Sequence, residues 1–111
     1  MKKQSEYIEY EYKQHSMSEH IDAEVDVNKP TSNGSTDFMY ACQHGHDELV
    51  SLLMKNTRID VNDQNNDGMT GLIWACNSGC VSTVRLLLRN PVIDRSLRNG
   101  DGESALDIAK A

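Results

Sequence analysis

The sequence predicts an all-α repeat solenoid, in which short pairs of helices stack side by side, and two observations support this prediction. Residues 34 to 111 repeat with an offset of 34, so that Gly34 and Thr36 recur as Gly68 and Thr70. Within each unit, two apolar stretches follow the spacing of one helix face. A period of this length indicates stacked supersecondary units instead of a single globular core.

Each unit is expected to begin with a hairpin tip. Asn65-Asn66-Asp67-Gly68 and Asn99-Gly100-Asp101-Gly102 hold turn-forming residues and the glycine at positive φ that a tight tip requires. Hydroxyl residues follow at Thr36, Thr70 and Ser104, where a side-chain oxygen can accept a hydrogen bond from a free helix N–H group. We therefore expect a first helix to begin near residues 37, 71 and 105.

A second helix should follow each complete first helix. Gly45 and Gly79 end the first helices, and apolar stripes then run from about Asp47 to Lys55 and from Val81 to Arg89. The predicted unit is thus a hairpin, a helix, a turn and a second helix, so that helix-turn-helix units are joined by β-hairpin loops.

These signals divide the chain into segments. We expect a polar, tyrosine-rich arm over 1–24, a partial unit end with its hairpin over 25–33, full units over 34–67 and 68–101, and the truncated start of a further unit over 102–111. Leu106 and Ile108 would begin a helix that has no partner helix. One interpretation is that the chain is an incomplete piece of a longer array. If it is instead a whole protein, Val84, Leu87 and Leu88 should lose part of their cover, because an array exposes an apolar face where stacking stops, and self-association or marginal stability would be the consequence.

The arm differs in kind from the units. From Ser5 to Tyr12, acidic residues alternate with apolar or aromatic ones, which fits a short strand or an extended linear motif. An upstream second helix would fall on His15 to His20, where no leucine occurs, so we do not expect a repeat there. The arm is a flexible polar leader, a docking segment whose tyrosines are phosphorylated, or a cap over the first unit.

The second unit resembles a known family. Gly68-Met69-Thr70-Gly71-Leu72-Ile73-Trp74-Ala75-Cys76, followed by Val84, Leu86 and Leu87, is similar to the ankyrin repeat, and the resemblance covers about 25 to 111. Asp37, Gly71 and Ala105 replace the proline that the family carries at the helix start. Since glycine in a helix costs up to about 1 kcal/mol relative to alanine, the inner helix of the second unit should fray.

The resemblance implies that the chain binds another protein through its hairpin tips and the concave surface of its inner helices. Carried over by position, the candidate contacts are Asn66, Asp67 and Met69 at one tip, Asp101 and Glu103 at the next, Gln43, His44, Asn77 and Ser78 at helix ends, and Tyr40 and Trp74 on successive inner helices. The two aromatic residues form a binding stripe or fill gaps between helices.

Three functions are compatible with this fold. The chain is an adaptor or regulatory module, a targeting or inhibitory segment of a larger enzyme or transcription regulator, or a structural spacer without a specific surface. Asn28 and Asn62 precede the hairpins and should form side-chain hydrogen bonds that shape the hairpin base. The resemblance also implies that such asparagines can be hydroxylated.

Composition excludes several other classes. The formal net charge of -6 and the pI of about 5.0 disfavour binding to nucleic acid or to an anionic membrane. Arg85, Arg89, Arg95 and Arg98 form a local basic group, which is a solvated helix face or a surface for an acidic partner. No apolar run approaches the roughly 20 residues of a membrane span, and we expect an intracellular protein, cytoplasmic or nuclear.

No catalytic, cofactor or metal site is predicted. The three cysteines should be reduced thiols, with Cys42 and Cys76 at equivalent core positions. Cys76, Cys80, His44 and His46 have poor spacing for the closed four-ligand sites of structural zinc. The glycines are explained by hairpin tips instead of a phosphate-binding loop, so we expect no enzyme activity.

Overall fold

The structure is a computed structural model that describes residues 26–110, so predictions about the N-terminal arm lie outside the described residues. These residues form helices α3 (Asp37–Gln43), α4 (Asp47–Met54), α5 (Gly71–Asn77), α6 (Val81–Leu88) and α7 (Ala105–Lys110). Every first helix begins where the sequence predicts. The second helices end one residue earlier than predicted, because Lys55 and Arg89 are their C-caps.

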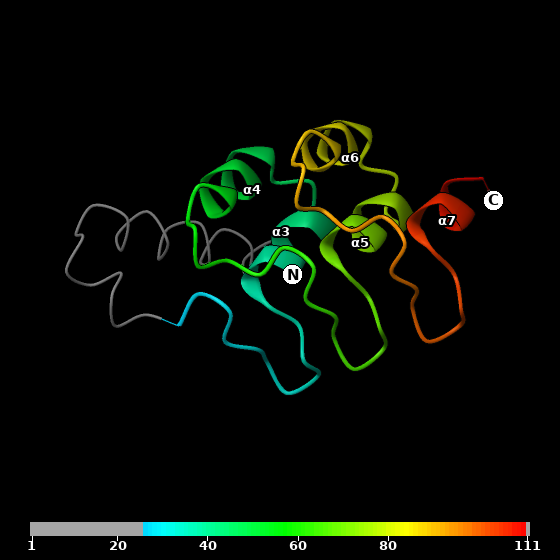
Figure 1. Cartoon of the computed structure of the whole chain (residues 1–111), viewed down its shortest axis with the longest axis horizontal. Helices are drawn as coiled ribbons and strands as arrows, with labels where there is room; N and C mark the ends of the chain where they lie inside the picture. Colours follow the sequence, from blue (N-terminus) through cyan, green and yellow to red (C-terminus); the bar gives the residue numbers. More distant parts are fainter. Residues whose placement is uncertain (1–25, 111) are drawn as a thin grey trace.

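The helices lie in two rows (Figure 1). The inner row consists of α3, α5 and α7, the outer row of α4 and α6, and the hairpin loops extend on the side opposite the outer row. Contacts join α3 to α5, α5 to α7, and α4 to α6, so each unit packs against the next. Between residues 26 and 110 the only β-structure is an isolated antiparallel β-bridge between Arg98 and Ser104. The predicted helical repeat solenoid is confirmed.

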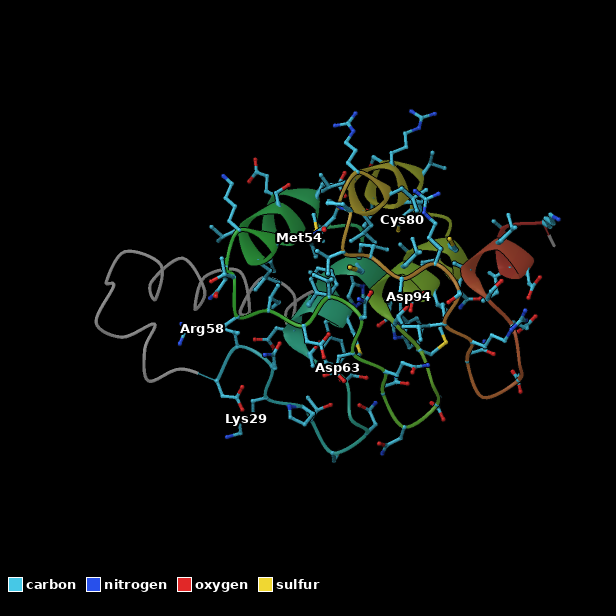
Figure 2. The ribbon with its side chains drawn as sticks, in the orientation of Figure 1. Lys29, Met54, Arg58, Asp63, Cys80 and Asp94 are labelled. Carbon is cyan, nitrogen blue, oxygen red and sulfur yellow. The ribbon has the colours of Figure 1, made fainter. Side chains whose placement is uncertain are left out.

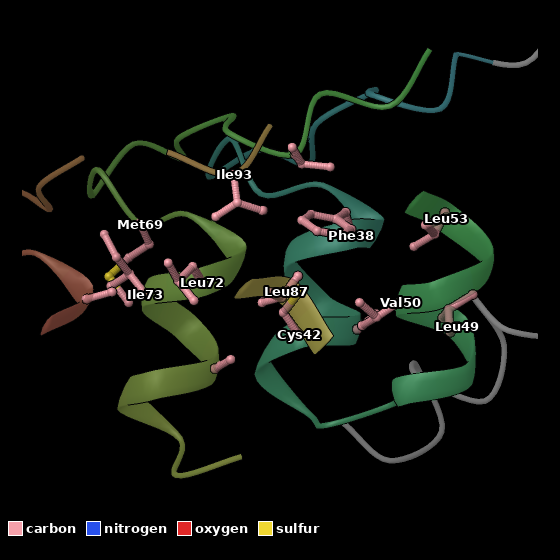
Figure 3. Close-up of a cluster of buried hydrophobic side chains, with 14 of the residues drawn as sticks. Phe38, Cys42, Leu49, Val50, Leu53, Met69, Leu72, Ile73, Leu87 and Ile93 are labelled. Carbon is pink, nitrogen blue, oxygen red and sulfur yellow. The ribbon is translucent and has the colours of Figure 1, made fainter. Parts of the chain in front are cut away.

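One continuous apolar core fills the space between the rows (Figure 3). Phe38 and Cys42 of α3 lie beside Val50 of α4 and Leu87 of α6, and all four are at most 2% exposed. Leu87 is 0% exposed, so the prediction that it loses its cover is wrong. Its side chain points back into the preceding unit, whereas Val84 and Leu88 are only half-buried.

Hydroxyl caps fix the helix starts. The Thr36 and Thr70 side chains accept hydrogen bonds from Met39 N and Ile73 N at 3.3 and 3.1 Å. At α7 the arrangement is reciprocal, because Ser104 Oγ accepts from Asp107 N at 3.3 Å while Asp107 Oδ2 accepts from Ser104 N at 3.0 Å. These bonds with Ser104, and then the Arg98 guanidinium at 3.1 Å, hold the pKa of Asp107 below its ordinary value.

Gly71 has a packing role that the sequence does not reveal. It is buried at the start of α5, and a Cβ atom there would lie 2.7 Å from Phe38 Cε2 and 2.9 Å from Cys42 Sγ. The inner helices therefore approach so closely that the first turn of α5 has no room for a side chain. The predicted fraying of this helix start remains a prediction.

Two asparagines connect successive hairpins. Asn28 donates to Arg58 O at 2.8 Å and accepts from Asp60 N at 2.7 Å. Asn62 repeats this geometry one unit later, donating to Val92 O at 2.9 Å and accepting from Asp94 N at 2.7 Å. The side-chain hydrogen bonds expected at these positions are present, and they join the base of one hairpin to the base of the next.

We predict that Gly71→Ala destabilises the fold although alanine is the better helix former. The helix propensity gain is at most about 1 kcal/mol, whereas overpacking a well-filled core costs about 1–3 kcal/mol. Urea unfolding followed by circular dichroism should show a net loss of roughly 1 kcal/mol. The loss should shrink in a Phe38→Leu background, and an increase in stability for the single variant would contradict the packing argument.

We predict that Asn62→Ala lowers the free energy of unfolding by about 1–2 kcal/mol, because two hydrogen bonds between hairpins are lost. Asn66→Ala is the matched control, since Asn66 is exposed and its side-chain bond to Ser32 O is 3.5 Å long. Chemical denaturation of both variants tests this. Equal losses would show that the bridging geometry of Asn62 is not what stabilises the fold.

We predict that acid weakens α7 through Asp107. Because the folded pKa is lowered below the ordinary value of 3.8, ionised Asp107 stabilises the fold above that pH, and this stabilisation is lost as pH falls through the folded pKa. Unfolding free energies measured between pH 5 and 2 should fall less steeply for Asp107→Asn than for the parent chain. Arg98→Gln should retain most of the steepness, since Ser104 is the larger cause of the shift. Identical slopes for Asp107→Asn and the parent would refute the prediction.

Candidate functional site

The hairpin tips form a row of backbone turns that are joined to one another. Glycine stands at positive φ in each tip, with φ 81° at Gly34, 75° at Gly68 and 79° at Gly102. Asn66 N donates to Asn33 O at 2.9 Å, and Gly100 N donates to Asp67 O at 2.7 Å. Each tip is therefore joined to its neighbour by a hydrogen bond between backbone atoms.

The side chain of Asn65 holds the central tip in place through hydrogen bonds. Its Oδ1 accepts from Asp67 N and from Met69 N, both at 2.9 Å, and its Nδ2 donates to Ser35 Oγ at 3.1 Å. The sequence identifies Asn65 only as a turn former, although its burial to 7% exposure makes it the residue that holds this tip against the preceding unit. No sequence pattern predicts that an asparagine three positions before a tip glycine is buried.

Four of the five predicted tip contacts face solvent. Asn66, Asp67, Asp101 and Glu103 are exposed. Met69 is different, because it is 8% exposed and its side chain lies in the core (Figure 3). The backbone turns at Gly68, so the next side chain points inward toward α5 and away from the tip. Met69 is thus not an accessible contact, which corrects the expectation drawn from the pattern.

The predicted contacts at the helix ends fall into two groups. Asn77 and Ser78, at the end of α5, are exposed, whereas Gln43 and His44, at the end of α3, are half-buried. Gln43 O accepts from Cys80 Sγ at 3.8 Å, where Cys80 precedes α6 (Figure 2). Burial, and then the charge of the nearby His46 ring, lower the pKa of His44 below its ordinary value.

Tyr40 and Trp74 occupy equivalent places on α3 and α5. Both are half-buried and pack against the core, and Tyr40 Oη lies 3.4 Å from Thr31 Oγ1. Ile108 of α7 continues this row and is also half-buried. Each ring fills space beside the core and keeps part of its surface accessible, so the structure leaves both the packing and the binding interpretation in place.

The thiols of Cys42 and Cys76 are poorly suited to nucleophilic chemistry. All three cysteines are free, and burial raises the pKa of Cys42 and of Cys76, which keeps these thiols protonated. Within the part of the chain that the structure describes, no three His, Cys, Asp or Glu side chains are grouped to hold a metal ion. No helix of residues 26–110 is long and apolar enough to cross a membrane.

An apolar groove of about 400 Å³ opens at the end of the array that carries α7. Leu72 and Cys76 of α5, Val84 and Leu88 of α6, and Leu106 of α7 line it. Cys76 is half-buried as a result, whereas Cys42, its equivalent one unit earlier, is 0% exposed. Among the described residues, this apolar surface is therefore open beside α7.

Comparison with known proteins agrees with this architecture. A family model for ankyrin repeats, in three copies, matches residues 10–99. The matched region starts at residue 10 and so includes much of the arm that the sequence analysis separates from the repeats. A search of curated proteins gives no match. Because the match spans most of the chain and the helix pairs follow its period, the chain belongs to the ankyrin repeat family.

Proposed function

We propose that the chain is an adaptor or regulatory module that binds a protein partner through its hairpin tips and the accessible side of its inner helices. Ankyrin repeats are in general protein–protein interaction modules. The observation that carries the proposal is the row of exposed polar side chains on a hydrogen-bonded series of turns. Asn66, Asp67 and Asp101 project from tips whose backbones are bonded to each other.

Preorganisation favours binding at this row. Because Gly100 N is bonded to Asp67 O and Asn65 holds the central tip, little loop entropy remains to be lost when a partner binds. Trp74 on α5 supplies an aromatic side chain with accessible surface next to the exposed Asn77. Tryptophan is enriched among the residues that dominate interface energies, so Trp74 is a suitable centre for the contact.

The charge of the hairpin tips indicates which kind of protein surface would bind to them. The exposed tips carry the carboxylates of Asp67, Asp101 and Glu103, and the positive charge of Arg98, in the same hairpin as Asp101, is engaged by bonds to Gly102 O and to Asp107. A negative row of this kind favours a partner surface that presents lysine or arginine. The three free cysteines support an intracellular location for this interaction.

We predict that Asp67→Lys weakens partner binding at least tenfold without changing the unfolding midpoint, because it reverses charge at an exposed tip. Glu48→Lys is the matched control, since Glu48 is an exposed carboxylate on α4 in the outer row. The partner is first captured with a photo-crosslinking residue at position 77, and the purified pair is then titrated by calorimetry.

Two outcomes would refute this function. One is equal weakening by Asp67→Lys and Glu48→Lys, which would indicate an effect of net charge only. The other is a partner that cross-links equally well from position 48 and from position 77, which would move the contact to another surface. Loss of binding together with loss of the cooperative unfolding transition would not support the proposal.

A further inference from the structure

The methionines of residues 26–110 differ in how accessible their side chains are. Met39 of α3 is 1% exposed and Met69 is 8% exposed, so both side chains are buried. Met54, the last residue of α4, is half-buried (Figure 2). Because an oxidant dissolved in water reacts with a methionine sulfur that it can reach, access favours Met54 over the other two.

The sulfur of Met54 also has a hydrogen-bond donor beside it. Asn90, which lies two residues after the end of α6, donates from Nδ2 to Met54 Sδ at 3.5 Å. A thioether sulfur is a weak acceptor, so this bond stabilises little while the sulfur is reduced. Met69 has a comparable neighbour, Asn99 Nδ2 at 3.9 Å, but its side chain is buried. In the described part of the chain, access and a donor therefore coincide at Met54 only.

The contact between Met54 and Asn90 continues into the hairpins. Asn90 Oδ1 accepts a hydrogen bond from Val92 N at 2.9 Å, and Val92 O accepts one from Asn62 Nδ2, also at 2.9 Å. Asn62 stands at the base of the hairpin whose tip carries Asp67. A series of hydrogen bonds thus runs from the Met54 sulfur in the outer row to the base of this hairpin.

Comparison of the two units separates the turn from the sulfur contact. Asn56 is equivalent to Asn90, and its Oδ1 accepts from Arg58 N at 2.9 Å, so the asparagine oxygen has the same turn-forming role in both units. The residue equivalent to Met54 one unit later is Leu88. Leucine is thus compatible with the end of an outer helix, and packing alone does not require a sulfur atom at position 54.

We propose that Met54 is a site of reversible oxidation, at which a peroxide converts the thioether to a sulfoxide and the Asn90 amide binds the added oxygen. The O–O bond of the peroxide breaks and one of its oxygen atoms forms a bond with the sulfur. The sulfur loses two electrons, and hydrogen peroxide is reduced to water.

The Asn90 amide is what makes this modification compatible with the fold. A sulfoxide oxygen is a much stronger acceptor than a thioether sulfur, and a polar group at a half-buried position costs free energy unless it is hydrogen-bonded. The donor that binds the sulfur weakly is in place to bind the oxygen. The site includes neither a hairpin tip nor an inner helix, so it is independent of the proposed function.

The first test measures selectivity on the full chain with hydrogen peroxide, and mass spectrometry of proteolytic peptides follows each methionine. In the folded chain Met54 should react roughly tenfold faster than Met39 and Met69, because these two are buried. In concentrated urea the three should react at similar rates. Methionine sulfoxide reductase with a thiol reductant should then restore the original mass of the peptide that contains Met54.

The second test measures stability and uses Asn90→Asp as the matched variant. Aspartate keeps an oxygen for Val92 N but removes the amide donor beside the sulfur. Oxidation should leave the folding equilibrium constant of the parent chain within about threefold and lower that of Asn90→Asp by roughly tenfold, since a carboxylate repels the sulfoxide oxygen. Dithiothreitol, added after the peroxide, reverses disulfides and sulfenic acids of the cysteines and leaves the sulfoxide.

A third variant, Met54→Leu, carries the residue found one unit later and reports the contribution of all other oxidised residues. In proton–nitrogen correlation spectra, peroxide should shift the side-chain amide signals of Asn90 in the parent chain and leave them in place in Met54→Leu.

Three results would overturn the proposal. Equal oxidation rates of Met54 and Met69 in the folded chain would show that position 54 is not selected. Equal losses of stability on oxidation of the parent and of Asn90→Asp, or unshifted Asn90 amide signals in the oxidised parent, would show that Asn90 does not bind the oxygen.

Discussion

The close packing of α5 against α3 is the contact on which the rest of the structure depends. Gly71 brings the start of α5 against Phe38 and Cys42, and this approach sets the distance between α3 and α5. The hairpins that precede α3 and α5 are held at a matching distance, at which Asn28 reaches Arg58 O and Asn66 N reaches Asn33 O. The spacing of the exposed tips is thus a consequence of a packing contact in the core.

Most of the fold follows from local signals in the sequence. Thr36, Thr70 and Ser104 predict the three inner-helix starts correctly because a side-chain cap acts within its own turn of helix. What the sequence predicts poorly is burial that involves the neighbouring unit. Leu87 is expected to be uncovered and is fully buried, because α6 turns this residue toward α3 and α4.

In the candidate site, too, features set by local turn chemistry could be predicted, whereas features set by contacts between units could not. The exposed residues of the tips could be predicted because turn chemistry is local, and Asn66, Asp67, Asp101 and Glu103 lie where expected. Met69 could not, since a position within a repeat pattern does not state which way its side chain points. Gly71 is a weakness by helix propensity alone, and only the contacts with Phe38 and Cys42 reveal why a glycine stands there.

The asparagine bridges run in one direction, from each hairpin to the following one. Asn28 binds residues 58 and 60, Asn62 binds residues 92 and 94, and the next equivalent residue, Ser96, bonds instead to Asp94 within its own turn. Among the described residues, every such connection joins adjacent units, so no hydrogen bond ties the first hairpin directly to the last. In such a stack each unit is held by its immediate neighbours, so a change at one hairpin reaches a distant hairpin only through every unit that lies between them.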